Sequence, residues 1–553
     1  MCRIAASENI PEPVREYTST RPESFVPMSN PLLLLFHMLS ALLVVALVAA
    51  LNVPSHGLAK RDHEYRITIL HSNDVHSHLQ EFGVSGLQCT EAEKEENKCY
   101  GGVARMMHKI KEIRAISPNL VLLDAGDQMQ GNLLDHATIA RFMNSMKYDV
   151  MALGNHEFDQ GQESLAKLVS ELNFPVVSAN MDLSRSNLLK DTAIKPYFII
   201  ERYGLAILGL LTSESRHRLI IGTSDIDFLD PVVTAQVYID ELHAMGIKRI
   251  IALTHNGYEE DTLIAKGTHG INLIVGGHSH TLVPTTAIQC EVVGHESERS
   301  YIVQAHQFGD HLGHVELTYS DNDELISIGG SSILLDQTVQ EDSELKELVR
   351  ETQQILDKAN SGKRIIANAL NDFPPCEKKS AVCAMAVLIG ECLLEEDNDT
   401  TFETVAFMNN GGVRASFRKG SITVGSVFTV LPFGNKVARY IATGQDIWDT
   451  IEGSIRGRNV LTNEVIGSNP QWAGLTYEFD ETLSPMLQSV WIEDKRLELS
   501  QEYAVLTSAP MIEGVDNILS TKPLQFELGN NMADTIVECL YRRKVIEYTE
   551  NSI

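Results

Sequence analysis

Five short apolar runs, each followed directly by polar side chains, constrain the fold of this chain more than any other feature. The runs read RITIL, NLVLL, DVMAL, RIIAL and INLIV and lie between Arg66 and Val275. Longer segments with helical spacing of apolar residues separate them, and strands that alternate with helices are typical of a layered α/β domain. In an open α/β sheet the loops after the carboxyl ends of the strands converge on one crevice. The sequence therefore predicts an α/β domain whose polar loops meet at one place.

The residues that follow these runs are types that bind divalent metal ions. Taken singly, an Asp or Asn after a strand favours an ordinary turn, but five such motifs in order favour a shared site. Two cations about 3.5 to 4 Å apart need a bridging carboxylate together with imidazole and amide ligands, and we expect Asp127 to be the bridge. Imidazole-rich ligation makes zinc the preferred metal, with manganese, calcium or magnesium as alternatives. The predicted ligands are Asp74, His76, Asp127, Asn155, His255, His278 and His280.

His156 and Asp159 lie beside the predicted ligands, in the segment GNHEFD. Residues three apart can face each other on the first turn of a helix. A carboxylate that accepts from one imidazole nitrogen fixes the tautomer and orients the other nitrogen. We therefore predict that His156 stabilises or protonates the transition state and that Asp159 orients it, with metal-bound water as the nucleophile.

The charge of the chain limits its partners. It has 553 residues with 45 basic and 74 acidic side chains, a net charge of −29. Such a charge argues against a broad surface for nucleic acid or anionic lipid. An anionic substrate would have to be attracted locally, and two bound dications would supply that attraction.

An apolar run from Leu32 to Leu51 follows a polar leader. Its twenty residues suit a spanning helix, but Gly57-Leu58-Ala59 has the small-x-small pattern of a cleavage site. We expect cleavage near Ala59 and secretion, with a type II membrane anchor through residues 32–51 as the alternative. The polar C-terminal sequence VIEYTENSI predicts no lipid anchor.

Cysteine spacing fits an oxidising compartment. Cys89 and Cys99 bracket one short polar segment, and Cys376 and Cys383 bracket another. The odd number of cysteines in the mature part predicts at least one unpaired or intermolecular thiol among Cys290, Cys392 and Cys539.

Changes in residue pattern along the chain predict four segments. The polar segment between the two main parts lacks internal Gly and Pro and has apolar residues at helical intervals, which predicts a connecting helix. The expected boundaries are a leader with signal peptide or anchor at 1–59, the metal-binding domain at 60–336, the linker helix at 337–361 and a second domain at 362–553.

The order of the motifs DVH, GD, GNHEFD, H and GGHSH resembles that of the 5'-nucleotidases and apyrases in the calcineurin-like metallophosphatase superfamily. The segments YGGVAR, NNGGVR, LPFG and WAGL are also similar to that family. The resemblance implies a four-layer α/β/β/α metallophosphatase domain and a C-terminal α+β nucleotide-binding domain joined by a helix. It also implies that Asp74, His76, Asp127 and His280 hold one metal, and Asp127, Asn155, His255 and His278 the other. The implied substrate-binding residues are Asn409, Gly412, Arg414, Phe433 and Asp516, with Phe433 stacking on the base.

Two segments depart from the family pattern. CEKKSAVCAMAVLIG, residues 376–390, lacks the arginine usual there, so Lys378 or Lys379 is the nearest cation available to a phosphate. In APMIEGVDN, residues 509–517, Pro510 or Met511 stands where the second aromatic of the base clamp is expected. Both changes predict weaker phosphate and base binding.

The predicted function is that of a secreted apyrase that hydrolyses extracellular ATP and ADP towards AMP. The family that this chain resembles includes salivary apyrases, which inhibit platelet aggregation. The first alternative is a 5'-nucleotidase that converts AMP to adenosine and phosphate. The second alternative is a catalytically silent, nucleotide-binding scavenger, which the altered segment 376–390 favours.

Overall fold

The computed structural model describes residues 64–130, 134–212, 225–284, 300–359, 363–376 and 382–548. The apolar run at 32–51, Cys290, Lys378 and Lys379 lie outside the described residues. Among the helices that are described, none has the length and apolar character needed to cross a membrane.

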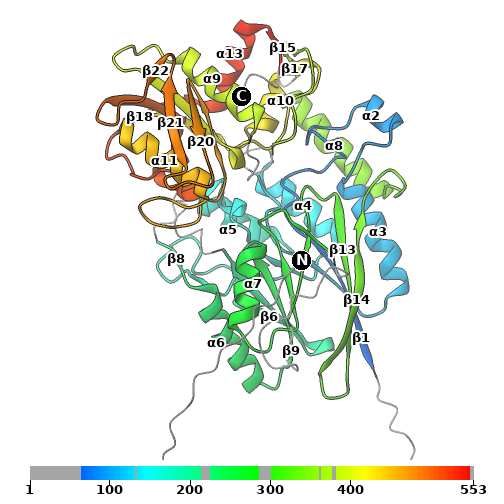
Figure 1. Cartoon of the computed structure of the whole chain (residues 1–553). Helices are drawn as coiled ribbons and strands as arrows, with labels where there is room; N and C mark the ends of the chain where they lie inside the picture. Colours follow the sequence, from blue (N-terminus) through cyan, green and yellow to red (C-terminus); the bar gives the residue numbers. More distant parts are fainter. Residues whose placement is uncertain are drawn as a thin grey trace, which may run out of the picture. The chain divides into compact units, whose positions relative to one another are not determined.

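The N-terminal part contains two six-stranded sheets (Figure 1). The first has the strand order β14-β13-β1-β2-β3-β4, with β1 parallel to β2 and antiparallel to β13. Its strands are β1 (Tyr65–Ser72), β2 (Leu120–Asp124), β3 (Val150–Ala152), β4 (Val176–Val177), β13 (His311–Tyr319) and β14 (Leu325–Leu334). The second has the order β11-β12-β10-β9-β7-β6. Its strands are β6 (Tyr197–Ile200), β7 (Leu205–Leu211), β9 (Arg249–His255), β10 (Leu273–Gly276), β11 (Leu282–Val283) and β12 (Tyr301–Ala305).

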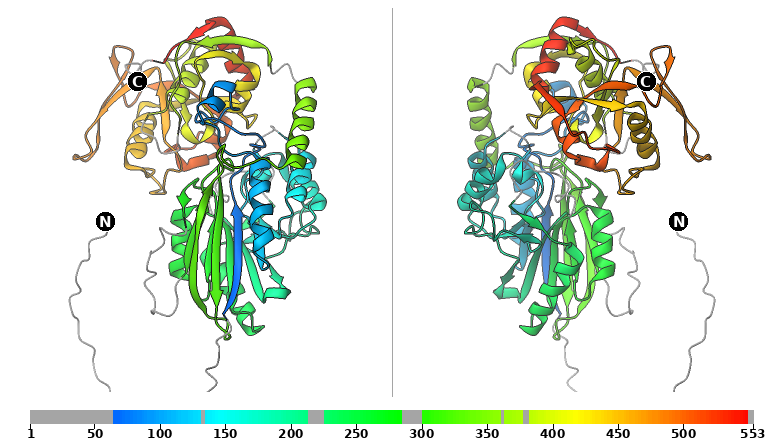
Figure 2. Two further views of the ribbon diagram at one scale, coloured as in Figure 1. Left: turned by 90° about the vertical axis from the view of Figure 1, so that its right-hand side faces the viewer. Right: turned by 90° about the vertical axis from the view of Figure 1, so that its left-hand side faces the viewer.

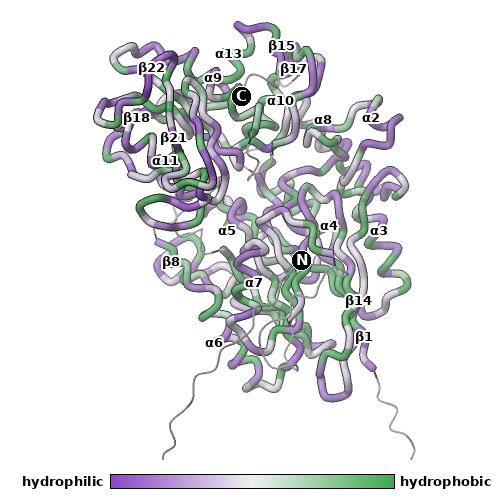
Figure 3. Tube along the Cα trace, in the orientation of Figure 1, coloured by the Kyte–Doolittle hydropathy of each residue, from purple (hydrophilic) through white to green (hydrophobic). Residues whose placement is uncertain are grey.

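Helices cover the outer faces of both sheets, which gives the four layers that the family resemblance implied (Figures 1 and 2). Alternate residues of the strands, such as Ile67 and Val121 in the first sheet and Ile251 in the second, form the core between the sheets. The helices against the first sheet are α3 (Val103–Ile116), α4 (His136–Met146) and α5 (Gly161–Glu171), and those against the second are α6 (Pro231–Ala244) and α7 (Tyr258–Gly267). Figure 3 shows apolar and polar residues alternating along these outer helices, as expected for helices with one buried face.

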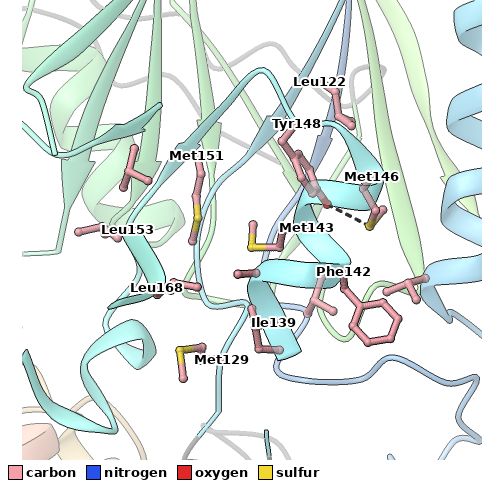
Figure 4. Close-up of a cluster of buried hydrophobic side chains, with 14 of the residues drawn as sticks. Leu122, Met129, Ile139, Phe142, Met143, Met146, Tyr148, Met151, Leu153 and Leu168 are labelled. Carbon is pink, nitrogen blue, oxygen red and sulfur yellow. Dashed lines mark hydrogen bonds between the residues drawn. The ribbon is translucent and has the colours of Figure 1, made fainter. Parts of the chain in front are cut away.

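The packing of α4 on the first sheet is typical of this core. Figure 4 shows Met143 of α4 near Met151 of β3 and Tyr148, with Leu122 of β2 beyond Tyr148 in the same core. Tyr148 follows the helix, and its hydroxyl contacts Ser72 Oγ at 2.8 Å at the end of β1. This buried contact ties the end of α4 to the strand from which the first ligand loop leaves.

The C-terminal part is built on a five-stranded sheet with the order β19-β16-β23-β18-β24. One face packs on α9 (Ala384–Glu396) and α13 (Met532–Arg543), and the other on α11 (Gly444–Arg456). The strands of this sheet are β16 (Thr404–Asn409), β18 (Lys436–Thr443), β19 (Pro470–Ala473), β23 (Glu502–Ser508) and β24 (Phe526–Asn531). Smaller sheets contain β15 (Ile365–Ala369), β17 (Gly420–Thr423) and β25 (Val545–Ile546), and β20 (Leu475–Phe479), β21 (Leu487–Ile492) and β22 (Lys495–Arg496). The C-terminal part also contains the short helices α10 (Val424–Val430) and α12 (Ala509–Glu513).

The connecting helix is shorter at its start than the predicted 337–361. α8 spans Ser343–Ala359. Asp336 Oδ1 accepts from the Thr338 amide at 2.9 Å, which makes a turn, and Asp342 Oδ1 accepts from the Leu345 amide at 3.1 Å. The second contact caps the first turn of α8, so the helix begins after Asp342 rather than at Gln337.

Three disulfides join described cysteines. The cysteines that bracket the two short polar segments form two of them, Cys89–Cys99 and Cys376–Cys383. Cys392 of α9 pairs with Cys539 of α13, at a sequence separation of 147 residues. The sequence left the partners of these two cysteines open because spacing says nothing about a bridge between distant helices.

Candidate active site

The structure brings six of the seven predicted ligands together, and they come from two sheets. Asp74, Asp127 and Asn155 follow β1, β2 and β3 of the first sheet, whereas His255 is the last residue of β9 and His278 follows β10 of the second. Asp74 Oδ1 lies 3.2 Å from His280 Nε2 and 3.5 Å from His76 Nε2. The facing edges of the two sheets thus supply one cluster. Its ligand atoms form three groups, within each of which they lie within 4.8 Å of one another: Asp74, His76 and His280; His76, Asp127 and His156; and Asp127, His255 and His278.

Asp127 has the position of a bridging ligand. Its Oδ2 lies 2.9 Å from His255 Nε2 and 3.9 Å from both His76 Nε2 and His156 Nε2. His76 belongs to the group around Asp74, and His255 to the group around His278. One carboxylate therefore faces both candidate metal positions, which is the arrangement a two-metal site requires.

The backbone at the ligands is strained in a consistent way. Asp74, His76, Asp127, His278 and His280 all have positive φ, between 50° and 77°. Such values are uncommon for residues other than Gly, though Asp, Asn and His tolerate them best, and they cluster at functional sites. Close packing adds to this, because a Cβ on Gly154 would stand 2.1 Å from Asp127 Oδ1. The backbone conformations of these loops are unfavourable locally, but they bring the ligand side chains together.

The donor set fits two cations, judged by its unsatisfied atoms. Asp74 Oδ1, Asn155 Oδ1 and His255 Nε2 are buried and have no hydrogen-bond partner among the described residues. His255 Nδ1 contacts the Ala125 carbonyl at 2.7 Å, so Nε2 is the ring nitrogen that faces the cluster. Burial disfavours a charged His255, yet Asp127 and Asp74 raise its pKa to about 10. The carboxylates thus stabilise positive charge at the place where a cation would lie.

Glu157 is a residue of the site whose role the sequence did not reveal. It is fully buried, and its carboxylate accepts from the amides of Gly154 (2.6 Å), Asp127 (2.9 Å), Gln128 (2.8 Å) and Met129 (3.2 Å). Burial and the nearby Asp127 raise the pKa of Glu157 to about 7. Glu157 therefore fixes the loops after β2 and β3 to each other. In the sequence, only its position within GNHEFD could have indicated this role.

His156 and Asp159 make the predicted contact. His156 begins the short 3-10 helix η1 (His156–Phe158), and its Nδ1 lies 2.8 Å from Asp159 Oδ2. The His156 amide donates to Asp127 Oδ1 at 2.8 Å, so the same residue is fixed to the candidate bridge. The His156 ring stacks on Phe433, with centroids 5.2 Å apart and an angle of 17° between the planes. The histidine next to the metal ligands and the predicted base-stacking residue are therefore neighbours.

The other predicted substrate residues lie around the end of β16. Asn409 Nδ2 donates to Asp516 Oδ2 at 2.8 Å and to Ser468 Oγ at 3.3 Å. A Cβ on Gly412 would stand 2.8 Å from Asn409 Oδ1, so the chain passes this amide closely. Arg414 Nε donates to Gln130 Oε1 at 3.1 Å, and its guanidinium carbon lies 5.9 Å from the Phe433 ring centre. Asn409 and Asp516 thus share a hydrogen-bond network, and Arg414 lies near Phe433, the ring that stacks on His156.

The segment expected to hold the second base-stacking position contains α12. Met511 lies in α12 with an exposed fraction of 2% and belongs to the core on the α11 side of the sheet. A side chain buried there offers no exposed face to a base. Pro510, at the start of the same helix, is half-buried.

The N-terminal fold and its cluster define a class, the calcineurin-like phosphoesterases, whose family matches residues 67–282. The family of 5'-nucleotidase C-terminal domains matches residues 361–522. A snake venom 5'-nucleotidase from Naja atra is 32% identical over 452 residues, which cover 76% of this chain and 83% of that protein. The human 5'-nucleotidase is 30% identical over 450 residues, 76% of each chain. The chain therefore belongs to the 5'-nucleotidase family.

A solved structure agrees with this assignment. The crystal structure of a 5'-nucleotidase precursor from Thermus thermophilus is similar with a TM-score of 0.74 and 30% identity. The match covers 87% of this chain and 97% of that one. Both halves of the fold are thus found together in one known protein.

Proposed function

We propose that this chain is a metal-dependent hydrolase that releases the terminal phosphate of nucleoside 5'-phosphates. The observation that carries the proposal is the cluster around Asp127, where ligand atoms lie close together and Asp74 Oδ1, Asn155 Oδ1 and His255 Nε2 are buried with no hydrogen-bond partner among the described residues. Membership of the 5'-nucleotidase family supports a phosphoric ester hydrolase.

Each group of the site has a distinct role in this proposal. Asp74, His76, Asp127 and His280 would hold one divalent cation, and Asp127, Asn155, His255 and His278 the other, with zinc preferred by the imidazole content. A pair of cations held there would supply Lewis-acid polarisation of a phosphoryl oxygen and activation of water. His156 donates a hydrogen bond or a proton to the phosphoryl group through Nε2, because Asp159 holds its Nδ1. Asn409, Gly412, Arg414 and Asp516 form the nucleotide side, and Phe433 offers a ring face to the base.

Two substrate classes are each favoured by one observation. The names of the relatives favour nucleoside monophosphates such as AMP. The burial of Met511 favours ADP and ATP, because a base with only one aromatic neighbour binds weakly. Additional phosphates would then contribute binding through the cations and Arg414.

Release of phosphate from ATP, ADP and AMP, each with and without chelator, tests the proposal. Cleavage of ATP and ADP that stops at AMP identifies an apyrase, and cleavage of AMP identifies a 5'-nucleotidase. Binding of nucleotide with no phosphate release in the presence of zinc or manganese would contradict both and leave a scavenger.

We also propose that the protein is secreted. The three disulfides support this, since such bonds persist in oxidising compartments. N-terminal sequencing of protein recovered from culture medium tests it: a start near Lys60 is expected, whereas retention of residues 32–51 in a membrane fraction would support the anchor instead.

A further inference from the structure

A second cluster of metal-ligand side chains lies outside the candidate active site. His306 and Asp310 lie in the turn between β12 and β13, and His311 is the first residue of β13. Their ligand atoms all lie within 4.8 Å of one another. His306 Nδ1 is 2.6 Å from Asp310 Oδ2, and His311 Nδ1 is 2.9 Å from Asp310 Oδ1. One carboxylate therefore faces two imidazoles, each through a different oxygen.

Two atoms of this cluster share the signature of the ligand atoms at the active site. Asp310 Oδ1 and His311 Nδ1 are buried, and although they are close, no hydrogen bond of acceptable geometry joins them or links them to other described residues. Asp74 Oδ1 and His255 Nε2 are in the same condition. Buried polar atoms without partners are costly and call for an explanation, such as an ion.

The backbone of the turn holds these side chains in place. His306, Phe308 and Gly309 have φ of 60°, 59° and 69°, and the Asp310 amide donates to the Gln307 carbonyl at 3.2 Å. Three side chains of metal-ligand type within six residues are common in flexible segments. Here a tight turn joins two neighbouring strands, so the three side chains already lie together without an ion.

The chemistry of the cluster indicates the kind of ion. Two imidazole nitrogens and one carboxylate oxygen suit zinc and other transition metals better than calcium or magnesium. Tetrahedral ligands about 2.0 Å from zinc are roughly 3.3 Å apart, so the two contacts of 2.6 and 2.9 Å need to lengthen by about 0.4 to 0.7 Å. Asp310 and His311 are largely buried, whereas the His306 side chain is 36% exposed and leaves the cluster open on one side. Three protein ligands and one water would complete the shell.

We propose that His306, Asp310 and His311 bind a third divalent transition-metal ion, separate from the pair at Asp127. The ion would brace the turn that supports the first ligand loop. The Phe308 amide donates to the Asp74 carbonyl at 2.6 Å, and Asn73 Nδ2 donates both to the His306 carbonyl and to Asp74 Oδ2, each at 2.7 Å. Asp310 thus acts on Asp74 as a positioning residue through the backbone of its own turn.

Metal counting on the full chain tests the site. After loading with Zn²⁺ and dialysis, we expect about three zinc ions per wild-type chain and about two in Asp310→Asn, since the catalytic centre accounts for two. His136→Gln is a matched control, because His136 faces Glu171 at 3.7 Å but belongs to no three-residue ligand cluster among the described residues. Two ions in the wild type, or three in Asp310→Asn, would overturn the proposal.

Anomalous diffraction at the zinc edge from wild-type crystals does not depend on any variant. A peak among the three side chains is expected, in addition to the peaks beside Asp127. Peaks beside Asp127 alone would overturn the third site, whereas a peak at Asp310 alone would support it and count against the proposed catalytic centre. In Asp310→Asn, loss of the ion at Asp74 to a chelator should be faster, on the order of tenfold. An unchanged rate would remove the bracing role.

Discussion

The candidate metal centre and the polar group at the end of β16 contain similar residue types but differ in how far their own contacts satisfy them. At the metal centre Asp74 Oδ1, Asn155 Oδ1 and His255 Nε2 are buried without hydrogen-bond partners among the described residues. Around β16, Asp516 Oδ2 accepts from Asn409 at 2.8 Å and from Ser468 Oγ at 2.6 Å. The first group is incomplete without cations, whereas the second already has an internal network. Changes in the first should therefore act on metal binding and turnover, and changes in the second on stability and substrate affinity.

The largest expected effect is that of Asp127→Asn. Loss of the bridging carboxylate should release at least one cation and lower turnover by at least about 10⁴-fold, equivalent to more than about 5 kcal/mol of barrier. Phosphate release and metal content measure the two effects. Retention of both ions with normal turnover would break the distinction between the two regions.

His156→Ala should lower kcat by roughly 10² to 10⁴ while both ions stay bound, as expected on losing a positioned acid–base group. Asp159→Asn should lower it less, because the imidazole remains in place. His136→Ala, on α4, serves as the control and should leave kcat unchanged. His156 Nε2 lies 3.9 Å from Asp127 Oδ2, close enough for both to bind one ion. Loss of metal in His156→Ala would therefore show that His156 is a ligand.

Phe433→Ala should raise KM by about 5- to 100-fold, the range for losing one base-stacking ring. Phe433→Tyr should restore affinity. Since Phe433 also stacks on His156, kcat must be measured with KM. A fall in kcat with KM unchanged for every nucleotide would show that the ring acts through His156 and not on the base.

Asp516→Asn should destabilise the fold by about 1 to 3 kcal/mol while metal content stays normal, because Asn409 or Ser468 loses an acceptor in a buried place. Urea unfolding measures this effect. If the variant loses zinc at normal stability, the two regions are one cooperative site.

The last expected effect concerns pH. Asp261 of α7 is fully buried beside Thr254, and burial raises its pKa to about 8. A carboxyl whose folded-state pKa is raised contributes stability that is complete below its unfolded value of 3.8 and is lost as pH rises towards about 8. Wild-type stability should therefore fall from pH 5 to pH 8 relative to Asp261→Asn. Parallel unfolding free energies for the two proteins would contradict this.

That these side chains meet could be predicted from the sequence because the information is local. Each predicted ligand lies at or soon after the end of an apolar strand, and the strand ends carry those residues to the same place whichever sheet they belong to. That β9 and β10 form a second sheet could not be read from the runs, since parallel strands of either sheet look alike. Only the resemblance implied four layers.

Contacts between distant segments were the part that the sequence could not supply. The Cys392–Cys539 bridge and the burial of Met511 depend on how helices pack over the C-terminal sheet. The start of α8 was placed too early because residues 337–342 contain no Gly or Pro that would mark a boundary before the Asp342 cap. The cluster at His306 had a local signal, HQFGDH after the run YIVQA, but two histidines and one aspartate in a turn are common without a metal.

The left-handed backbone of the ligand loops also restricts how this protein could change over generations. At Asp74, His76, Asp127, His278 and His280 the positive φ tolerates Asp, Asn, His or Gly far better than branched or bulky residues. A descendant that abandoned catalysis would be expected to accumulate Asn and Gly there, and not Val or Ile. The positive φ of these turns would therefore persist after the metal-dependent activity was lost.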